Sequence, residues 1–201
     1  MDVRLLITEL FEKLSLIATA GLLSVLVPPL RNRLLGVGRP RDIAVVIIFG
    51  LFFSMWGSTM GFDWLGHHLN LRAIGIIIAG ILGGPRAGAL VGLLGGGQYV
   101  LRVHPEGFPW DLAASILDGW LAGRMSVRRE RMFVGWRVLS GAALVQLAGL
   151  SVTAIGLGVT GGNPVAALPS LLAQLVGVAV GVALFVNVAL VVISRQDQAV
   201  A

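Results

Sequence analysis

Long apolar runs separated by short polar or basic stretches recur from one end of the chain to the other. An α-helix needs about 17 to 25 apolar residues to cross the hydrocarbon of a bilayer. The pattern therefore predicts an all-α fold, a polytopic membrane helix bundle with six to seven membrane segments. We expect the bundle to occupy residues 1–194 and a short polar cytoplasmic tail to occupy residues 195–201. The runs cover approximately residues 5–30, 43–60, 69–84, 86–101, 112–123, 133–157 and 165–193.

The apolar stretch from Leu69 to Arg102 is broken in its middle by Gly83, Gly84 and Pro85. Proline cannot continue a helix from its N-terminal side without losing a hydrogen bond, so two short helices joined in a tight hairpin are predicted. Helices of about 16 residues span only about 24 Å, less than the roughly 30 Å of hydrocarbon. They therefore need surrounding helices, and such short or broken helices are tolerated where they line a cavity.

Two short basic loops, Arg31 to Arg41 and Arg124 to Arg131, indicate the orientation of the chain. Arginine-rich short loops remain in the cytoplasm, so an even number of crossings must separate these two. Counting the Leu69–Leu101 stretch as one span gives three crossings, whereas splitting it at the break gives four. The N-terminus is therefore expected outside and the C-terminus in the cytoplasm.

The composition supports a membrane protein and excludes several functions. The chain is 56% hydrophobic and 12% charged, whereas soluble domains carry about 25% charged residues. The net charge of +5 comes from arginines in short loops, which indicates topology and contact with lipid headgroups rather than nucleic-acid binding. The absence of cysteine excludes disulfides, thiolate metal sites and cysteine nucleophiles. The first apolar run lacks the features of a signal peptide and is expected to be retained as a span.

Arginines within the membrane are costly and therefore indicate function. Arg72 and Arg102 are predicted at the outer ends of the two hairpin helices, with Gln98 and Tyr99 nearby. Two guanidinium groups and an amide that converge on an outward-facing cavity would suit a small carboxylate, because arginine binds carboxylates through two parallel hydrogen bonds. The alternative is that both arginines reach the lipid headgroups or pair with an acidic residue, namely Asp63, Glu106 or Asp111.

Other polar and small residues give weaker indications. Asp118 could be a proton relay, a counter-ion for an arginine or a hydrogen-bond acceptor between helices, and pairing is the preferred interpretation. The pairs Gly88/Gly92 and Gly92/Gly96 form faces of small residues that let helices approach closely.

No metal site, cofactor or catalytic residue is predicted. Asp63, His67, His68 and His104 resemble a metal cluster only weakly, because adjacent histidines in a connector point to opposite sides. Neither a Ser/His/Asp order nor a paired-carboxylate arrangement is evident, so we do not expect an enzyme.

The hairpin resembles a known family signature. Residues 70–96, NLRAIGIIIAGILGGPRAGALVGLLGG, are similar to the pattern N-x-R-A-I-G, a short apolar run, G-G-P and G-x-x-x-G-L of the LytS/YhcK-type five-transmembrane receptor domains. FEKLSLIATAGLLSVLVPPLRNRLL resembles the first helix of that family with its basic stop. LPSLLAQLVGVAVGVALFVNVALVVISR resembles its last helix, so the resemblance covers nearly the whole chain.

The resemblance implies a sensory input domain in the bacterial cell (inner) membrane. Relatives carry this domain before a histidine kinase or a diguanylate cyclase, and small extracellular metabolites such as pyruvate are among the implied ligands. The asparagine and the first arginine of the family fall on Asn70 and Arg72. Two departures are present: the histidine–arginine pair of the family is replaced by Gln98 and Tyr99, and a later asparagine by Gln174. The resulting candidate ligand-binding residues are Asn70, Arg72, Gln98, Tyr99, Arg102 and Ser115.

The preferred functional prediction is a module that recognises a small anionic carboxylate from the outer side and signals to a cytoplasmic partner. It would act within membrane lipid as a homodimer or with a separate signalling protein, and no nucleic acid is involved. One alternative is the substrate-binding subunit of an energy-coupling-factor type transporter, and another is a structural subunit of a larger membrane complex. The residues between the last apolar run and Ala201 contain no kinase or cyclase sequence, so the chain is expected to be a freestanding relative or an isolated input domain.

Overall fold

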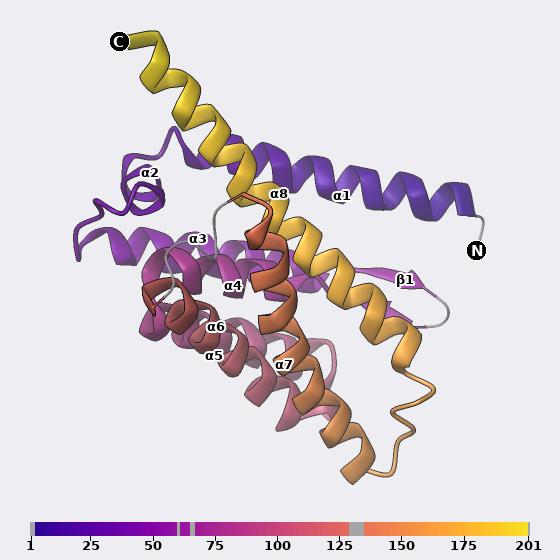
Figure 1. Cartoon of the computed structure of the whole chain (residues 1–201). Helices are drawn as coiled ribbons and strands as arrows, with labels where there is room; N and C mark the ends of the chain where they lie inside the picture. Colours follow the sequence, from indigo (N-terminus) through magenta and orange to yellow (C-terminus); the bar gives the residue numbers. More distant parts are fainter. Residues whose placement is uncertain (1–2, 60, 65–66, 129–134, 201) are drawn as a thin grey trace.

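The chain forms a bundle of α-helices with one short β-hairpin between the third and fourth helices (Figure 1). The computed structural model describes residues 3–59, 61–64, 67–128 and 135–200. Its helices are α1 (Val3–Ser24), α2 (Pro28–Leu34), α3 (Asp42–Thr59), α4 (Arg72–Gly83), α5 (Pro85–Arg102), α6 (Trp110–Arg128), α7 (Arg137–Val159) and α8 (Leu168–Val200), with a short 3-10 helix η1 (Pro105–Gly107) before α6. The predicted helical class is confirmed.

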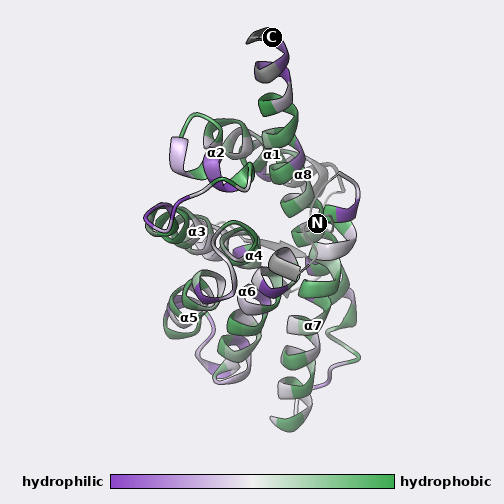
Figure 2. Ribbon diagram, turned by 60° about the vertical axis from the view of Figure 1, so that its left-hand side comes forward, coloured by the Kyte–Doolittle hydropathy of each residue, from purple (hydrophilic) through white to green (hydrophobic). Residues whose placement is uncertain are grey.

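Helix α4 lies at the centre of the bundle, between α3, α5 and α6, with α8 alongside (Figure 2). All residues from Arg72 to Gly80 are buried, so over these residues every face of the helix contacts protein. Its 12 residues span only about 18 Å. The expectation that a short hairpin helix must be surrounded by other helices is therefore confirmed for α4.

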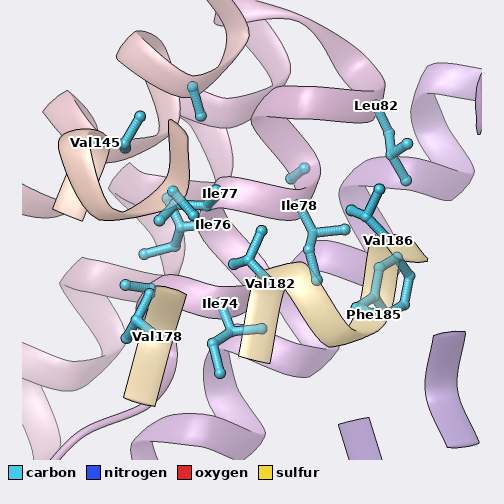
Figure 3. Packing of buried hydrophobic residues seen from close by; sticks show 14 of the residues in the cluster. Ile74, Ile76, Ile77, Ile78, Leu82, Val145, Val178, Val182, Phe185 and Val186 are labelled. Atoms are coloured by element: carbon cyan, nitrogen blue, oxygen red, sulfur yellow. The ribbon is translucent and has the colours of Figure 1, made fainter. Parts of the chain in front are cut away.

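The core of the bundle consists of branched aliphatic side chains around α4. Ile74, Ile76, Ile77 and Ile78 are each at most 3% exposed. Figure 3 shows them packed with Val145 of α7 and with apolar side chains of α8. This apolar contact places α8 directly against the central helix.

The helix break lies where the sequence predicts it. Gly84 has a φ of +83°, a conformation that favours glycine, and its N–H donates to the Gly80 carbonyl at 2.9 Å. Pro85 opens α5 at a position that needs no N–H donor. The Ile81 carbonyl, four residues before Pro85, receives a hydrogen bond from the Ser126 hydroxyl at 3.0 Å instead. A side chain of α6 thus supplies the donor that proline lacks.

Backbone atoms of α4, α5 and α6 approach closely near this break through a set of glycines, which we call the glycine seam. A Cβ atom added to Gly88 would overlap the Gly119 carbonyl, and a Cβ atom added to Gly119 would overlap the Gly88 carbonyl. A Cβ atom on Gly92 would overlap the Ser115 carbonyl in the same way, which confirms that the predicted small-residue faces are packing faces. The seam consists of Gly80, Gly88, Gly92, Gly119 and Gly123.

Three elements differ from the sequence prediction. The first apolar run forms two helices bent by 96° at the residues before Pro28, rather than one run to Leu30. The fifth run is longer than predicted and forms the 19-residue α6. The polar residues predicted as a tail continue α8 to Val200, and this end of the helix projects beyond the bundle (Figure 1).

The connector between α3 and α4 contains an antiparallel β-hairpin that the sequence analysis does not predict. Strand β1 (Phe62–Trp64) pairs with β2 (His67–Leu69), with Phe62 opposite Leu69. The side chains of these strand residues lie outside the described part of the structure, and so do Asp63, His67 and His68 of the weak histidine cluster. The second predicted basic loop, Arg124 to Arg131, is part of α6 up to Arg128, and the rest of it lies outside the described residues.

The chain is a multi-pass membrane protein by the length and apolarity of its helices. Among the described residues, α3, α7 and the Leu168–Gln196 part of α8 are each long and apolar enough to cross a membrane, and the bent α1–α2 pair could supply a fourth span. The predicted count of six to seven membrane segments is not confirmed. Large apolar side chains are exposed on the outer faces of α3, α5, α7 and α8, among them Ile48, Phe52, Leu93, Leu144, Ile155 and Val176.

Candidate functional site

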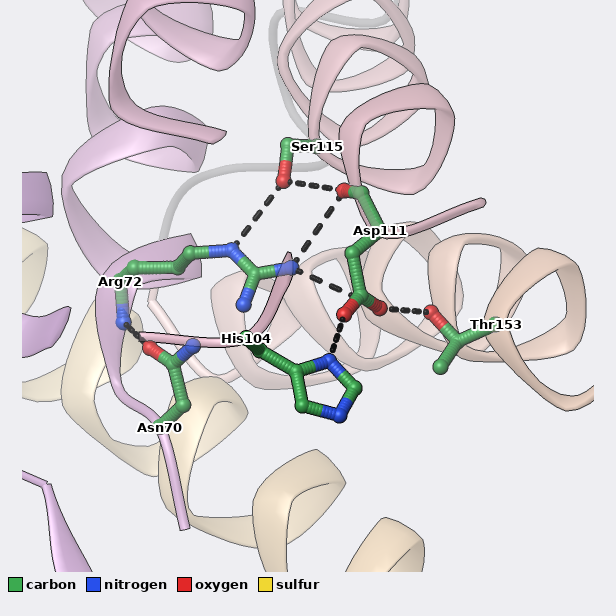
Figure 4. Close-up of polar contacts among 6 residues, drawn as sticks. All are labelled: Asn70, Arg72, His104, Asp111, Ser115 and Thr153. Carbon is green, nitrogen blue, oxygen red and sulfur yellow. Dashed lines mark hydrogen bonds and ion pairs between the residues drawn. The ribbon is translucent and has the colours of Figure 1, made fainter. Parts of the chain in front are cut away.

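Polar side chains gather at the end of the α4–α5 hairpin that lies away from the break. Arg72 begins α4, and Asp111 and Ser115 belong to the first turns of α6 (Figure 4). Tyr99 belongs to the last turn of α5. Because α4 and α5 are antiparallel, the first residue of α4 lies beside the last turn of α5. The hairpin thus brings Arg72 beside Tyr99, and α6 adds Asp111 and Ser115, which follow Arg72 by 39 and 43 positions.

The Arg72 guanidinium is held on three sides. Its Nε donates to Ser115 Oγ at 3.1 Å, and its Nη2 donates to the Asp111 carbonyl at 3.4 Å and lies 4.0 Å from Asp111 Oδ1. Its Cζ atom lies 4.0 Å from the centroid of the Tyr99 ring, a cation–π contact. Arg72 is only 7% exposed, so its charge is balanced by buried groups rather than by water.

Asp111 connects three parts of the chain. One carboxylate oxygen lies 2.9 Å from Nδ1 of His104, which follows α5, and the other accepts a hydrogen bond from the Thr153 hydroxyl of α7 at 3.2 Å. The side chain of Asp111 is 8% exposed, whereas that of His104 is 47% exposed. His104 therefore lies between the buried carboxylate and the surface.

Two hydrogen-bond donors in this site have no acceptor. Asn70 Oδ1 accepts the Arg72 backbone N–H at 2.8 Å, but the Nδ2 group of the same side chain, which is 2% exposed, has no partner among the described residues. Nη1 of Arg72 likewise makes no hydrogen bond to the described part of the chain, and it points to the side where the Asn70 amide lies (Figure 4). A buried donor without an acceptor costs about 1–3 kcal/mol, so the site favours an added acceptor.

The structure brings together four of the six residues that the sequence suggests for ligand binding: Asn70, Arg72, Tyr99 and Ser115. It does not bring Arg102 to Arg72, because Arg102 ends α5 one turn beyond Tyr99 and its side chain is exposed. Gln98 is partly buried, and its Oε1 has no partner in the described structure. Of the alternatives weighed for Arg72, pairing with Asp111 is the arrangement observed.

His104 and Thr153 are the participants that sequence reasoning missed. His104 was considered only for metal binding, and no group of three metal-ligating side chains is found among the described residues. Nothing in the sequence around Thr153 indicated its contact with Asp111, which lies 42 positions earlier.

Asp118 lies one helical turn beyond Ser115, on the side of α6 that faces α7. It is 4% exposed, and a Cβ atom on Gly149 of α7 would overlap its carboxylate. The predicted ion pair is not observed, since within the described part of the chain Asp118 has no ion-pair partner and its Oδ1 makes no hydrogen bond. Arg72 is near enough to act on it electrostatically.

Comparison with known proteins gives a family and several relatives. The family model described as 5TMR of 5TMR-LYT matches residues 32–192, a range that includes every residue of this site. The sensor histidine kinases BtsS of Escherichia coli (strain K12), Escherichia coli O6:H1 and Shigella flexneri are each 34% identical to the chain over 103 residues. The match covers 46% of this chain and 17% of each relative, so the chain corresponds to a small part of their length. No solved structure matches the chain.

Proposed function

The chain belongs to the 5TMR of 5TMR-LYT family, and from this premise we propose that it is a membrane-embedded sensory module that binds a small carboxylate from the outer side of the bacterial cell membrane. The observation that carries the ligand class is the buried Asn70 Nδ2 donor, which has no partner among the described residues and lies beside Arg72, whose Nη1 makes no hydrogen bond to them. The names of the curated relatives, which are sensor histidine kinases, support the sensory role.

A carboxylate fits these donors better than a neutral ligand does. Its two oxygens accept up to about four hydrogen bonds in one plane, which suits Arg72 Nη1 and the neighbouring Asn70 amide together. Hydrogen bonds to charged groups contribute about 1.5–3 kcal/mol, roughly twice the contribution of neutral ones. The ion pair of Arg72 with Asp111 is long, at 4.0 Å between Nη2 and Oδ1, and Nη1 makes no hydrogen bond to the described residues, so the guanidinium can still donate to an anion.

The packing of α4 suggests how binding would be transmitted. Ligand contacts at Arg72 act on the first residue of α4, and α4 packs directly against α8. A Cβ atom on Gly181 of α8 would lie 2.6 Å from Ile74 Cδ1, so the two helices are in close contact and a shift of α4 can be passed to α8. We expect α8 to carry the signal to a cytoplasmic partner, with the module acting as a homodimer or with a separate signalling protein.

Calorimetric titration of the purified protein in detergent with pyruvate, lactate, alanine and propionate tests the proposed site. Saturable binding of at least one of these is expected, together with a loss of at least 100-fold in Arg72→Ala. Arg102→Ala is the matched control, because it removes an exposed guanidinium from the same end of the hairpin and should leave binding unchanged. A folded protein that binds none of the four compounds, or an Arg72→Ala variant that binds them normally, would contradict the proposal.

A further inference from the structure

Asp111 places a hydrogen-bond acceptor next to the unpaired donors of the proposed site. From this arrangement we infer that the ligand carries an ammonium group on the carbon next to its carboxylate, that is, the ligand is a small 2-amino acid. The inference rests on the proposed function, because it names the ligand class of the same site. It assigns Asp111 the role of a specificity-determining residue.

Asp111 retains acceptor capacity for such a group. A carboxylate offers about four lone-pair positions, and in Asp111 each oxygen has a single hydrogen-bond partner, His104 for one and Thr153 for the other. The distance of 4.0 Å to Arg72 Nη2 exceeds the roughly 2.7–2.9 Å of a direct charged hydrogen bond. The buried guanidinium and the buried carboxylate are thus adjacent but form no direct hydrogen bond between Nη2 and Oδ1.

The charges of the buried groups also favour a zwitterion. Arg72 is a single cation, and the Asp111 carboxylate, with Oδ1 4.0 Å from Nη2, already balances its charge. A simple carboxylate would bring another negative charge into this buried cluster, where like charges repel strongly. A 2-amino acid brings a carboxylate for Arg72 and Asn70 together with an ammonium group for Asp111, so the net charge of the site does not change.

The geometry of a 2-amino acid matches the order of the groups in Figure 4. The unpaired donors Nη1 and Nδ2 lie on the Asn70 side of the guanidinium, and the Asp111 carboxylate lies on the opposite side, with His104 between them and the surface. In a 2-amino acid, the carboxylate and the ammonium group are attached to neighbouring carbon atoms. One small molecule can therefore reach the donors with one end and the acceptor with the other.

Four probes of nearly equal size test this inference, because they differ only at the second carbon. Alanine carries an ammonium group there, lactate a hydroxyl, pyruvate a carbonyl oxygen and propionate only hydrogen. We expect calorimetry to give the order of affinity alanine, lactate, then pyruvate and propionate, with alanine at least tenfold tighter than propionate. Binding of pyruvate or propionate that equals or exceeds that of alanine would overturn the inference while leaving the carboxylate site intact.

The variant Asp111→Asn tests whether Asp111 is the group that discriminates. It should weaken alanine binding at least tenfold and leave propionate binding unchanged or stronger, so that the order is lost. Equal weakening of all four probes would overturn the assigned role. Glu106→Gln is the matched control, since it makes the same carboxylate-to-amide change at an exposed position close in sequence to Asp111 and should preserve the order. The probe series on the unsubstituted protein decides the ligand class even if Asp111→Asn does not fold.

Discussion

The two ends of the α4–α5 hairpin are built from different interactions, although the same three helices pass through both. At the break, α4, α5 and α6 meet through the glycine seam, with backbone atoms in direct contact. At the other end, Arg72 and Tyr99 lie between the helices beside buried polar groups, one of which, Asn70 Nδ2, lacks a partner among the described residues. The seam glycines have no space for an added Cβ atom, and the other end has hydrogen-bonding capacity that the described part of the protein does not use.

This difference suggests a division of roles along one short hairpin. A contact between backbones cannot adjust by rotating a side chain, so the seam holds the three helices at a fixed spacing. The polar end depends on long side chains and on hydrogen bonds up to 3.4 Å, which can rearrange when a ligand binds. We therefore expect ligand binding to tilt α4 about its break rather than to slide it along its axis.

The largest expected effect comes from adding a single methyl group to the seam. In Gly119→Ala the new Cβ atom would overlap the Gly88 carbonyl. Overpacking of a tight core costs about 1–3 kcal/mol, and a clash with backbone falls at or above the upper end of that range. Thermal unfolding in detergent should show a large fall in stability or no folded protein.

Gly97→Ala is the control for this experiment. It adds the same methyl group to α5 at a position where nothing lies within 4 Å of the new Cβ atom. It should leave stability unchanged or raise it by about 0.5–1 kcal/mol, because alanine favours a helix interior over glycine. Equal behaviour of the two variants would show that the seam is not a rigid contact.

The next largest effect should come from the polar end and should concern binding rather than stability. Asn70→Asp keeps an oxygen that accepts the Arg72 backbone N–H but removes the unpaired Nδ2 donor. Loss of a hydrogen bond to a charged ligand costs about 1.5–3 kcal/mol, which corresponds to a loss of affinity for alanine of at least about tenfold. Calorimetry measures this change, and Asn70→Ser tests whether the added charge of Asp, rather than the lost donor, is responsible. Unchanged affinity in both variants would exclude Asn70 from the site.

The smallest effect should come from the hydroxyl at the break. Ser126→Ala removes the donor to the Ile81 carbonyl, which Pro85 leaves without an N–H partner. A single hydrogen bond of this kind contributes about 0.5–1.5 kcal/mol, so thermal unfolding should show a modest loss of stability that Ser126→Thr does not show. Ligand affinity should remain unchanged, and a change as large as that of Asn70→Asp would contradict the separation of the two ends.

The sequence predicts much of the fold because hydrophobic length and helix breakers are local signals. Gly84 and Pro85 mark the break by their own backbone properties, and Gly88 and Gly92 mark a packing face by spacing alone. The bend between α1 and α2 and the β-hairpin before α4 were not predicted. The bend lies at Pro28, after the extended Val27, so its position is a local signal although its angle was not predicted, whereas the hairpin depends on the pairing of two short segments.

The candidate site was predictable in part for a related reason. Arg72 is a conspicuous charge within an apolar run, so the sequence identifies it directly. The contacts of Asp111 with His104 and Thr153 depend on how α6 and α7 are rotated about their axes, which no local pattern encodes. The rotation of α5 about its own axis likewise decides that Tyr99, rather than Arg102, meets the guanidinium.

The complete burial of α4 from Arg72 to Gly80 has a consequence for the kind of stimulus this protein can register. Lipid does not touch these residues, so bilayer thickness, tension and lipid composition do not act on them directly. The helix that begins at the proposed binding site is thus separated from lipid by the surrounding helices. We expect the module to respond to the concentration of its ligand and not to the thickness or tension of the bilayer.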